Sequence, residues 1–460
     1  MRYRTKVAIV YLLGFFVDLI NMFIANVAYP AIGRGFGASV SELSWVSNAY
    51  ILGLTLVIPL SAWLAQRLGG RTVLLLSLSS FLLATLGAGM AQSIEQLIGW
   101  RLLQGLGGGL LIPVGQTLTY QLYHSHERAA LSAAIMLVGL LAPALSPAIG
   151  GVIVDSLSWR WVFFANLPLA FIALLLAAVW LQKEPRTTQP TALDFIGLGS
   201  GCGALMCTLL GFTMLAENGQ MLNGIVLLLC AITLFAGFFR HSLRHPQPLI
   251  NLRLVKEPLL RSAMMIYQCI PGMFIGVSLI ATLWLQNQLN LSATRVGSLM
   301  VPWSMASLLA ITFTGKQFNR FGPRPMLITG CLLQGLGILA LTLVHSAEQY
   351  PLLLVAFAMM GFGGSLCSST AQSCAFLQVA DEQLGQASAL WNINRQLSFC
   401  MGISILSLLL NTLLETLAPA AAYQWCFYLA AVSTLIPALL CLRIANGAIL
   451  RQLKAQKERR

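Results

Sequence analysis

Apolar stretches of about 20 residues recur along the whole chain, separated only by short polar breaks. A helix of that length crosses the hydrocarbon core of a bilayer, which is about 30 Å thick. Of the 460 residues, 57% are hydrophobic and 9% are charged, whereas soluble domains carry about 25% charged residues. The sequence therefore predicts an all-α integral membrane protein that is surrounded by the lipid bilayer and has no separate soluble domain.

Fourteen of these stretches are predicted to be transmembrane helices. The first begins after Arg2, Arg4 and Lys6, as a secretory signal would, but its apolar run is too long and contains Asp18, so we expect it to be retained. The predicted helices cover residues 7–29, 42–65, 72–92, 95–121, 130–154, 160–181, 195–216, 222–240, 261–283, 295–315, 325–344, 350–370, 388–412 and 423–444.

The Lys and Arg residues predict the orientation. With the N-terminus in the cytoplasm, the outside loops contain only Arg34, Arg160 and Arg295, and the other loop and tail cations lie inside. We therefore expect a multi-pass protein of the cell inner (cytoplasmic) membrane with both termini cytoplasmic. The net charge of +13 is explained by these scattered loop cations and does not indicate nucleic-acid binding.

A weak internal repeat predicts the domain organisation. Residues 61–71 read SAWLAQRLGGR and residues 315–324 read GKQFNRFGPR, and both join two predicted helices on the basic side. If these loops correspond, two six-helix bundles flank two inserted central helices, although short Gly- and Arg-containing turns are common at cytoplasmic ends. The expected parts are 1–182, 183–245, 246–446 and a basic cytoplasmic tail, 447–460. The expected conformational loop residues are Arg67, Gly69, Arg71, Gly315, Gly322 and Arg324.

Asp18 is the one acidic residue deep inside a predicted helix. A carboxylate near the bilayer centre costs about 2.5–3.5 kcal/mol on insertion scales, so it is expected to face a protein interior or a wet cavity. An acid that gains and loses a proton between two conformations couples transport to a proton gradient. The alternative is an acid that hydrogen-bonds Asn21, one turn away, and only fixes helix packing.

Two arginines also lie within predicted helices. Arg101 is followed by Gln104 on the same helix face and by glycines at 105 and 107–109, which allow a neighbouring helix to approach closely. Arg101 is a candidate relay partner for Asp18, or it extends to the outer surface. Arg395 either serves the substrate path or is tied to carbonyls or to Asn392.

The fifth predicted helix contains GLLAPALSPAIGG. Pro143 and Pro147 remove two backbone donors and bend a helix, while Gly150 and Gly151 permit close packing. A single Pro is tolerated in membrane helices, so the cluster is the informative feature.

These residues resemble the major facilitator superfamily, and within it the fourteen-helix drug:proton antiporters, over essentially the whole chain. The stretch from Arg101 to Gly107 is similar to the helix-4 motif, whose Arg is assigned to proton transfer, and Pro143 to Gly151 is similar to the helix-5 antiporter motif. Asn26 and Arg395 fall in further matching stretches and are expected to border the substrate path. The other similar stretches are 26–30, 159–164 with Asn166 and Pro168, 194–197, 248–252 and 395–397.

Several positions differ from the family pattern. The family has an acid where this chain has Asn21, with Asp18 one turn earlier on the same helix face. Gln66 and Asn319 replace the acid of the two corresponding loops, and Ala62 replaces a Gly. Helix 5 has Ala142 and Ser146 where the family favours Gly.

The sequence and this resemblance thus predict a secondary active transporter that exports small amphipathic or cationic organic compounds, including drugs, in exchange for protons and works as a monomer. The alternatives are export of a specific metabolite or peptide-like compound, and a uniporter or symporter without proton antiport. An enzyme is not expected, because no nucleophile with a paired base and no nucleotide-binding loop is present. No cofactor is expected, and the five histidines lie in predicted loops or helix ends, so no metal site is expected.

Overall fold

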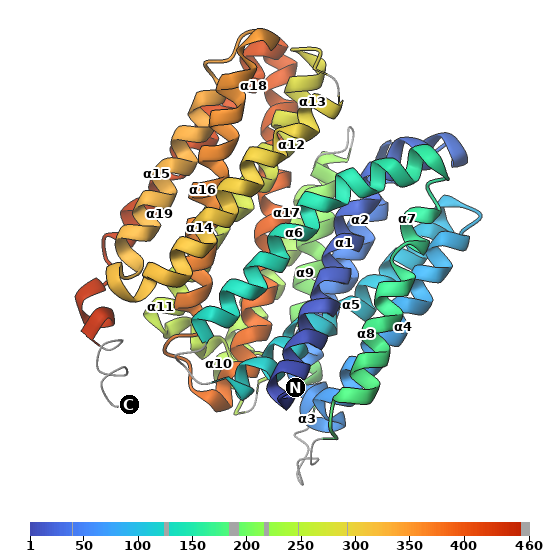
Figure 1. Cartoon of the computed structure of the whole chain (residues 1–460), viewed down its shortest axis with the longest axis vertical. Helices are drawn as coiled ribbons and strands as arrows, with labels where there is room; N and C mark the ends of the chain where they lie inside the picture. The colour runs from blue at the N-terminus through green and yellow to red at the C-terminus, as the bar shows by residue number, and fades with distance from the viewer. Residues whose placement is uncertain are drawn as a thin grey trace. The chain divides into compact units, whose positions relative to one another are not determined.

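A computed structural model describes residues 1–38, 40–123, 128–183, 193–215, 220–246, 248–291 and 293–451. These residues form helices joined by short turns and no strand (Figure 1). Within them, thirteen helical segments are long and apolar enough to cross a membrane. The predicted class, an all-helical multi-pass membrane protein, is confirmed.

Residue contacts divide the chain into two compact units. The first unit comprises Met1–His124, Leu141–Arg253 and Ala380–Ile393, and the second comprises Ser125–Leu140, Leu254–Val379 and Asn394–Arg460. The helices of the first unit are α1 (Tyr3–Phe36), α2 (Val40–Val57), α3 (Ser61–Leu68), α4 (Gly70–Met90), α5 (Ile94–Leu122), α7 (Trp161–Phe164), α8 (Leu167–Trp180), α9 (Phe195–Leu215) and α10 (Met221–Arg244). Those of the second unit are α11 (Pro258–Tyr267), α12 (Met273–Asn287), α13 (Ala293–Ser298), α14 (Met300–Phe321), α15 (Pro323–Leu341), α16 (Tyr350–Ala375), α18 (Pro419–Ser433) and α19 (Leu435–Cys441). Two helices, α6 (Arg128–Ser156) and α17 (Leu384–Thr416), have residues in both units.

Each of the fourteen predicted ranges coincides with helix, but α6, which covers 130–154, is not among the thirteen candidate spans. The count of fourteen and the predicted domain boundaries therefore stay predictions. Prolines divide two of the predicted helices because each removes a backbone donor. A 3₁₀ turn at Ile58–Leu60 separates α2 from α3, and a π turn at Gln268–Gly272, which contains Pro271, lies between α11 and α12.

One helix in each unit is surrounded by its neighbours. In the first unit α5 packs against α1, α2 and α4, and in the second unit α16 packs against α11, α14 and α15 (Figure 1). The two sets occupy corresponding places in the proposed repeat, so the same packing pattern recurs. The hairpin of α9 and α10 belongs to the first unit, where Asn48 of α2 donates to Thr213 of α9 over 3.4 Å.

The two repeat loops share one backbone conformation. Gly69 ends α3 with φ +84°, and Gly322 ends α14 with φ +76°. Both residues also have an extended ψ, 142° at Gly69 and 173° at Gly322. Positive φ combined with an extended ψ is accessible essentially to Gly alone, which explains why Gly stands at both positions. The two loops therefore share a Gly turn, which is compatible with the predicted repeat, and the repeat itself stays a prediction.

The residues beside each turn contact other residues of the same unit. Arg67 lies 5.1 Å from the centre of the Trp63 ring, and Arg71 Nη2 donates to Ala178 O over 2.7 Å. In the second loop the Arg324 N–H donates to Asn446 Oδ1 over 3.1 Å, whereas Gly315 lies inside α14.

Replacing either turn glycine with Ala is expected to destabilise the protein by about 1–3 kcal/mol, because an L-residue is strained at this φ and ψ. The effect is expected to be larger for Gly322→Ala, since the new Cβ would also overlap the Asn446 side chain, whereas Gly69 faces open space. The thermal unfolding midpoint of the detergent-purified protein measures both effects. Gly297→Ala is the control, because φ is not positive there and a Cβ meets no described atom within 4 Å. Equal midpoints for all three variants would contradict the argument.

Candidate functional site

Asp18 lies inside the first unit with 2% of its surface exposed. The hydroxyl of Tyr50, on α2, donates a hydrogen bond to Asp18 Oδ1 and lies 3.3 Å from the Asp18 carbonyl oxygen. From the other side, a Cβ added to Gly108 of α5 would overlap Asp18 Oδ1. The expectation that Asp18 faces a protein interior is confirmed, and the carboxyl group lies where α1, α2 and α5 meet.

Arg101 is fully buried on α5, so the alternative that its side chain extends to the surface is wrong. Its Nη1 donates to Asn21 Oδ1 and to Gln104 Oε1, each over 2.9 Å, and its Nε donates to Val46 O over 2.9 Å. Gln104 in turn donates to Thr85 Oγ1 over 2.6 Å. Arg101 thus connects α1, α2, α4 and α5 through hydrogen bonds.

Tyr50 connects the acid to the arginine. Its hydroxyl contacts Asp18, and the guanidinium carbon of Arg101 lies 4.3 Å from the centre of its ring, within the range of a cation–π interaction. Within the described part of the chain, two buried nitrogens beside it, Asn21 Nδ2 and Arg101 Nη2, have no hydrogen-bond partner. A buried donor without a partner costs about 1–3 kcal/mol, so the network has unused donors that another arrangement of these helices, or water, can satisfy.

The glycines of α5 allow this close packing. A Cβ on Gly105 would overlap the Tyr50 carbonyl, and one on Gly109 would lie 2.6 Å from the Leu54 carbonyl, both on α2. A Cβ on Gly107 would lie 2.7 Å from the Phe81 backbone nitrogen, on α4. The expected close approach of neighbouring helices is confirmed on two faces of α5.

The Pro/Gly cluster lies in α6, which is helical from Arg128 to Ser156. The side chains of Pro143 and Pro147 lie outside the described residues. Gly150 is buried, but nothing among the described atoms lies within 4 Å of a Cβ added at Gly151. Whether this cluster permits close packing therefore stays a prediction.

The two expected substrate-path residues are placed less completely. Asn26 lies in α1, but its side chain is outside the described part of the chain. Arg395 lies half-buried in α17, with Tyr267 near enough for an electrostatic interaction. The alternative, a tie of Arg395 to carbonyls or to Asn392, stays a prediction; among the described residues Asn392 Nδ2 donates to Gln116 Oε1 over 2.9 Å, and Asn392 Oδ1 has no hydrogen-bond partner.

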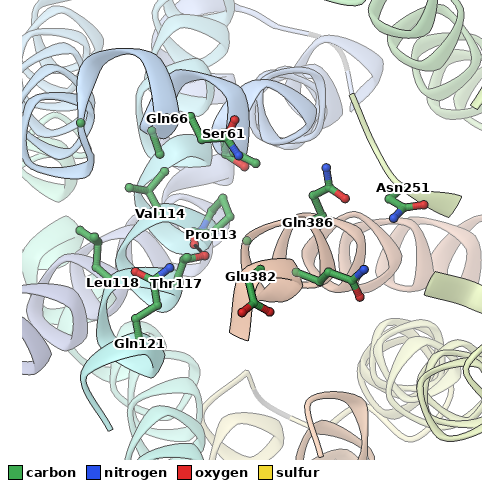
Figure 2. A pocket seen from close by; sticks show the side chains of 15 residues that line it. Ser61, Gln66, Pro113, Val114, Thr117, Leu118, Gln121, Asn251, Glu382 and Gln386 are labelled. Carbon is green, nitrogen blue, oxygen red and sulfur yellow. Dashed lines mark hydrogen bonds between the residues drawn. The ribbon is translucent and has the colours of Figure 1, made fainter. Parts of the chain in front are cut away.

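A cavity of about 420 Å³ lies in the first unit (Figure 2). Figure 2 shows Thr117 and Gln121 of α5 on one side, and Glu382, in the turn before α17, with Gln386 of α17 on the other. Its polar lining consists mainly of amide and hydroxyl groups, with Glu382 the one carboxylate among the lining residues of the described chain. The cavity can therefore accept hydrogen-bonding molecules and attracts cations.

The sequence model of the Major Facilitator Superfamily matches residues 11–403 and 263–459. The chain belongs to this superfamily. It is 30% identical over 398 residues to a "Multidrug resistance protein B homolog" of Mycobacterium tuberculosis (strain CDC 1551 / Oshkosh), covering 85% of this chain and 73% of that protein. It is 28% identical over 458 residues to the "Putative multidrug resistance protein MdtD" of Cronobacter sakazakii, covering 97% and 96% of the two chains.

A third relative is the "Drug efflux pump JefA" of the same Mycobacterium strain, 30% identical over 421 residues, covering 88% of this chain and 80% of that protein. Among solved structures, the human organic anion transporter MFSD10 (TETRAN) matches with a TM-score of 0.71 and 17% identity, covering 96% of this chain and all of that one. This likeness shows the fold alone. The resemblance to the family is confirmed, and this Major Facilitator Superfamily transporter has relatives named for multidrug resistance or drug efflux.

A second polar cluster of this superfamily member lies at the ends of α9 and α10. His241 Nε2 is 2.7 Å from Asp194 Oδ1, and the His241 and His245 rings are 5.1 Å apart. Burial alone would raise the pKa of Asp194, but hydrogen bonds from the Gly197 N–H, His241 and the Leu249 N–H together hold that pKa below its ordinary value. Asp194 is therefore ionised at neutral pH.

Two features of this transporter were not found from the sequence. Tyr50 was not singled out, because a lone Tyr in an apolar helix also fits a lipid-facing position. The expectation of no metal site stays a prediction, but the sequence did not reveal that one ligand atom each from Asp194, His241 and His245 lie within 4.8 Å of one another. The available signal was the spacing of His241 and His245, which puts both on one helix face.

Proposed function

We propose that this transporter exports small amphipathic or cationic organic compounds, including drugs, across the cell inner membrane in exchange for protons. The observation that carries the proposal is the buried Asp18, hydrogen-bonded to Tyr50 and connected through its ring to Arg101. An ionisable group inside a membrane protein is by default functional, because its burial is costly. The names of the relatives support the substrate class.

The proton step follows from the hydrogen bond between Asp18 and Tyr50. Ionised Asp18 only accepts hydrogen bonds, so the Tyr50 hydroxyl donates to it; protonated Asp18 has a donor of its own and carries no charge. Uptake of a proton from outside therefore weakens the attraction among Asp18, Tyr50 and Arg101, and release to the cytoplasm restores it. Because these residues lie on α1, α2 and α5, the two protonation states favour different packing of these helices.

Substrate enters, in this proposal, through the cavity lined by Gln66, Gln121 and Glu382. The loop between α3 and α4 is cytoplasmic by the distribution of positive charges, and Gln66 precedes it. The amide-lined wall orients polar groups of the substrate, and Glu382 attracts a cationic group. One such pathway is enough for exchange, so a monomer is sufficient for transport. In this proposal the monomer has fourteen transmembrane helices and cytoplasmic termini.

Replacing Glu382 with Gln is expected to raise the half-saturating concentration of cationic substrates by about threefold to tenfold, with little change for neutral ones. The substitution removes one charge from the cavity and keeps the size of the side chain, and an exposed charge–charge attraction contributes about 1 kcal/mol. Uptake of a cationic dye and of a neutral dye into inverted vesicles measures the difference. Glu348→Gln, at an exposed loop carboxylate of the other unit, is the control. An equal effect of Glu382→Gln on both dyes would contradict the charge argument.

The substrate proposal is tested by growing cells that lack or overproduce the protein on a panel of toxic amphipathic compounds. Overproduction is expected to raise tolerance to several cationic compounds, and dissipating the proton gradient is expected to abolish the gain. Tolerance that rises for no compound would contradict efflux of drugs.

A uniporter or symporter of a specific metabolite is the second candidate. Asn21, which stands where the family has an acid, accepts a hydrogen bond from Arg101 and cannot carry a proton. Under this alternative Asp18 remains in one protonation state throughout the cycle. Transport of the metabolite would then proceed at a rate independent of the pH difference across the membrane.

A further inference from the structure

We propose that Asp194, His241 and His245 form a binding site for one Zn²⁺ ion or a similar divalent transition-metal ion. Asp194 directly precedes α9, His241 lies in the last turn of α10, and His245 directly follows that helix. One ligand atom from each residue lies within 4.8 Å of the other two. Nothing in the proposed transport cycle requires these three residues, so the site is independent of it.

The ligand set suits zinc. Two imidazole nitrogens and one carboxylate oxygen are a common zinc set when a fourth position is open to water or another ligand. With bond lengths of about 2.0–2.2 Å, a tetrahedral ion places its ligand atoms about 3.4 Å apart. His241 Nε2 and Asp194 Oδ1 are 2.7 Å apart without an ion, so the ion separates these two atoms slightly and draws the His245 ring inward.

The surroundings of Asp194 hold its carboxylate in place. The Gly197 N–H donates to Oδ1 over 2.8 Å, and the Leu249 N–H donates to Oδ2 over 3.4 Å. An ionised carboxylate has about four acceptor positions, so these bonds leave room for a metal. Hydrogen bonds of this kind orient metal ligands and raise the affinity of a site.

A cavity beside Asp194 and the charge at the end of α10 also favour a bound cation. Asp194 borders a cavity of about 250 Å³ that also contacts Gln66 and Asn251, and this cavity offers an entry path and space for a water ligand. The C-terminal end of α10 carries partial negative charge, which favours a cation. The positive charge of Arg253 opposes cation binding there, because its guanidinium lies at the same helix end and donates to Leu243 O over 2.9 Å and to His245 O over 3.5 Å. Replacing Arg253 with Gln is therefore expected to tighten metal binding.

A bound ion would join the two ends of the α9–α10 hairpin. The same carboxylate is bonded to Leu249, in the segment that leads toward α11, so the ion would also restrain that segment. A ligand that binds only the folded protein raises its stability in proportion to the logarithm of its concentration. Zinc should therefore raise the thermal unfolding midpoint, and EDTA should reverse the rise.

The test uses the full chain, purified in detergent without a tag and stripped with EDTA, titrated with Zn²⁺ against a chromophoric zinc indicator. We expect one ion per chain, with affinity at least about tenfold lower in Asp194→Asn, His241→Gln and His245→Gln, unchanged in His345→Gln and higher in Arg253→Gln. These amide side chains are close in size to the ones they replace, and the amide oxygen in Asp194→Asn still accepts from the Gly197 N–H. His345 is exposed and far from the site in the chain.

Cysteines are the competing ligands, so Co²⁺ is titrated in parallel. The site predicts a spectrum without a sulfur-to-cobalt charge-transfer band, since it contains no thiolate. Saturable binding that is equal in the wild type and in the three ligand variants would overturn the proposal. A sulfur-to-cobalt band, or no EDTA-reversible rise in the unfolding midpoint of the wild type, would overturn it as well.

Discussion

Replacing Asp18 with Asn is expected to abolish uphill, pH-driven transport, lowering it at least about a hundredfold, while substrate binding survives. Asn keeps the size of the side chain and an acceptor for the Tyr50 hydroxyl, but it has no ionisable state. Transport down a substrate gradient should therefore continue when the proton gradient no longer drives it. Binding of a fluorescent substrate, and its accumulation in inverted vesicles at several pH differences, measure the two properties separately.

Two further variants separate coupling from packing. Tyr50→Phe keeps the ring next to Arg101 and removes only the hydroxyl, so coupling is expected to weaken without being lost. Combining Asp18→Asn with Asn21→Asp moves the acid one turn along the same face of α1, next to Arg101, and is expected to restore part of the coupling. Asp18→Asn with wild-type accumulation and unchanged pH dependence would mean that another group carries the proton.

Arg101→Lys is expected to lower transport at least about tenfold, although the charge is kept. The guanidinium donates in fixed directions to Asn21, Gln104 and the Val46 carbonyl, and an ammonium group on a flexible chain cannot reproduce that fork. Arg101→Ala is expected to be worse, because each buried acceptor that loses its donor costs about 1–3 kcal/mol. Substrate accumulation in vesicles and the thermal unfolding midpoint measure the two losses.

Arg160→Lys is the matched control for Arg101. Arg160 also donates to backbone carbonyls, Gly89 O over 2.9 Å and Ala91 O, but it lies outside the network around Asp18. It should affect stability without changing the pH dependence of transport. If Arg101→Lys transports at the wild-type rate, the buried hydrogen-bond network is not needed for the cycle.

Most of the helical architecture follows from the sequence, because apolar runs of bilayer length leave the backbone few alternatives to helix. The glycine turns at residues 69 and 322 were found from a local motif, since both loops carry Gly between basic residues. Asp18 and Arg101 were identified because an ionisable residue inside an apolar run is costly and therefore conspicuous.

The partners of these residues could not be predicted in the same way. The Val46 carbonyl binds Arg101 only because α2 and α5 touch at glycines, and no side-chain pattern encodes a backbone acceptor. Gln66, Gln121 and Glu382 line one cavity. Glu382 is more than 250 residues from the other two along the chain, so the sequence does not indicate that they lie together. The grouping of Asp194 with the histidine pair was also missed, because Asp194 directly precedes α9 and the histidines lie at the end of α10, far along the chain.

The most direct test of the central claim is proton movement measured with a pH-sensitive dye in sealed vesicles that contain only the purified protein. With no pH difference imposed, adding substrate to one side should drive protons in the opposite direction, and the signal should be absent in Asp18→Asn vesicles that still bind the substrate. Substrate that crosses the membrane of wild-type vesicles with no movement of protons would contradict the account.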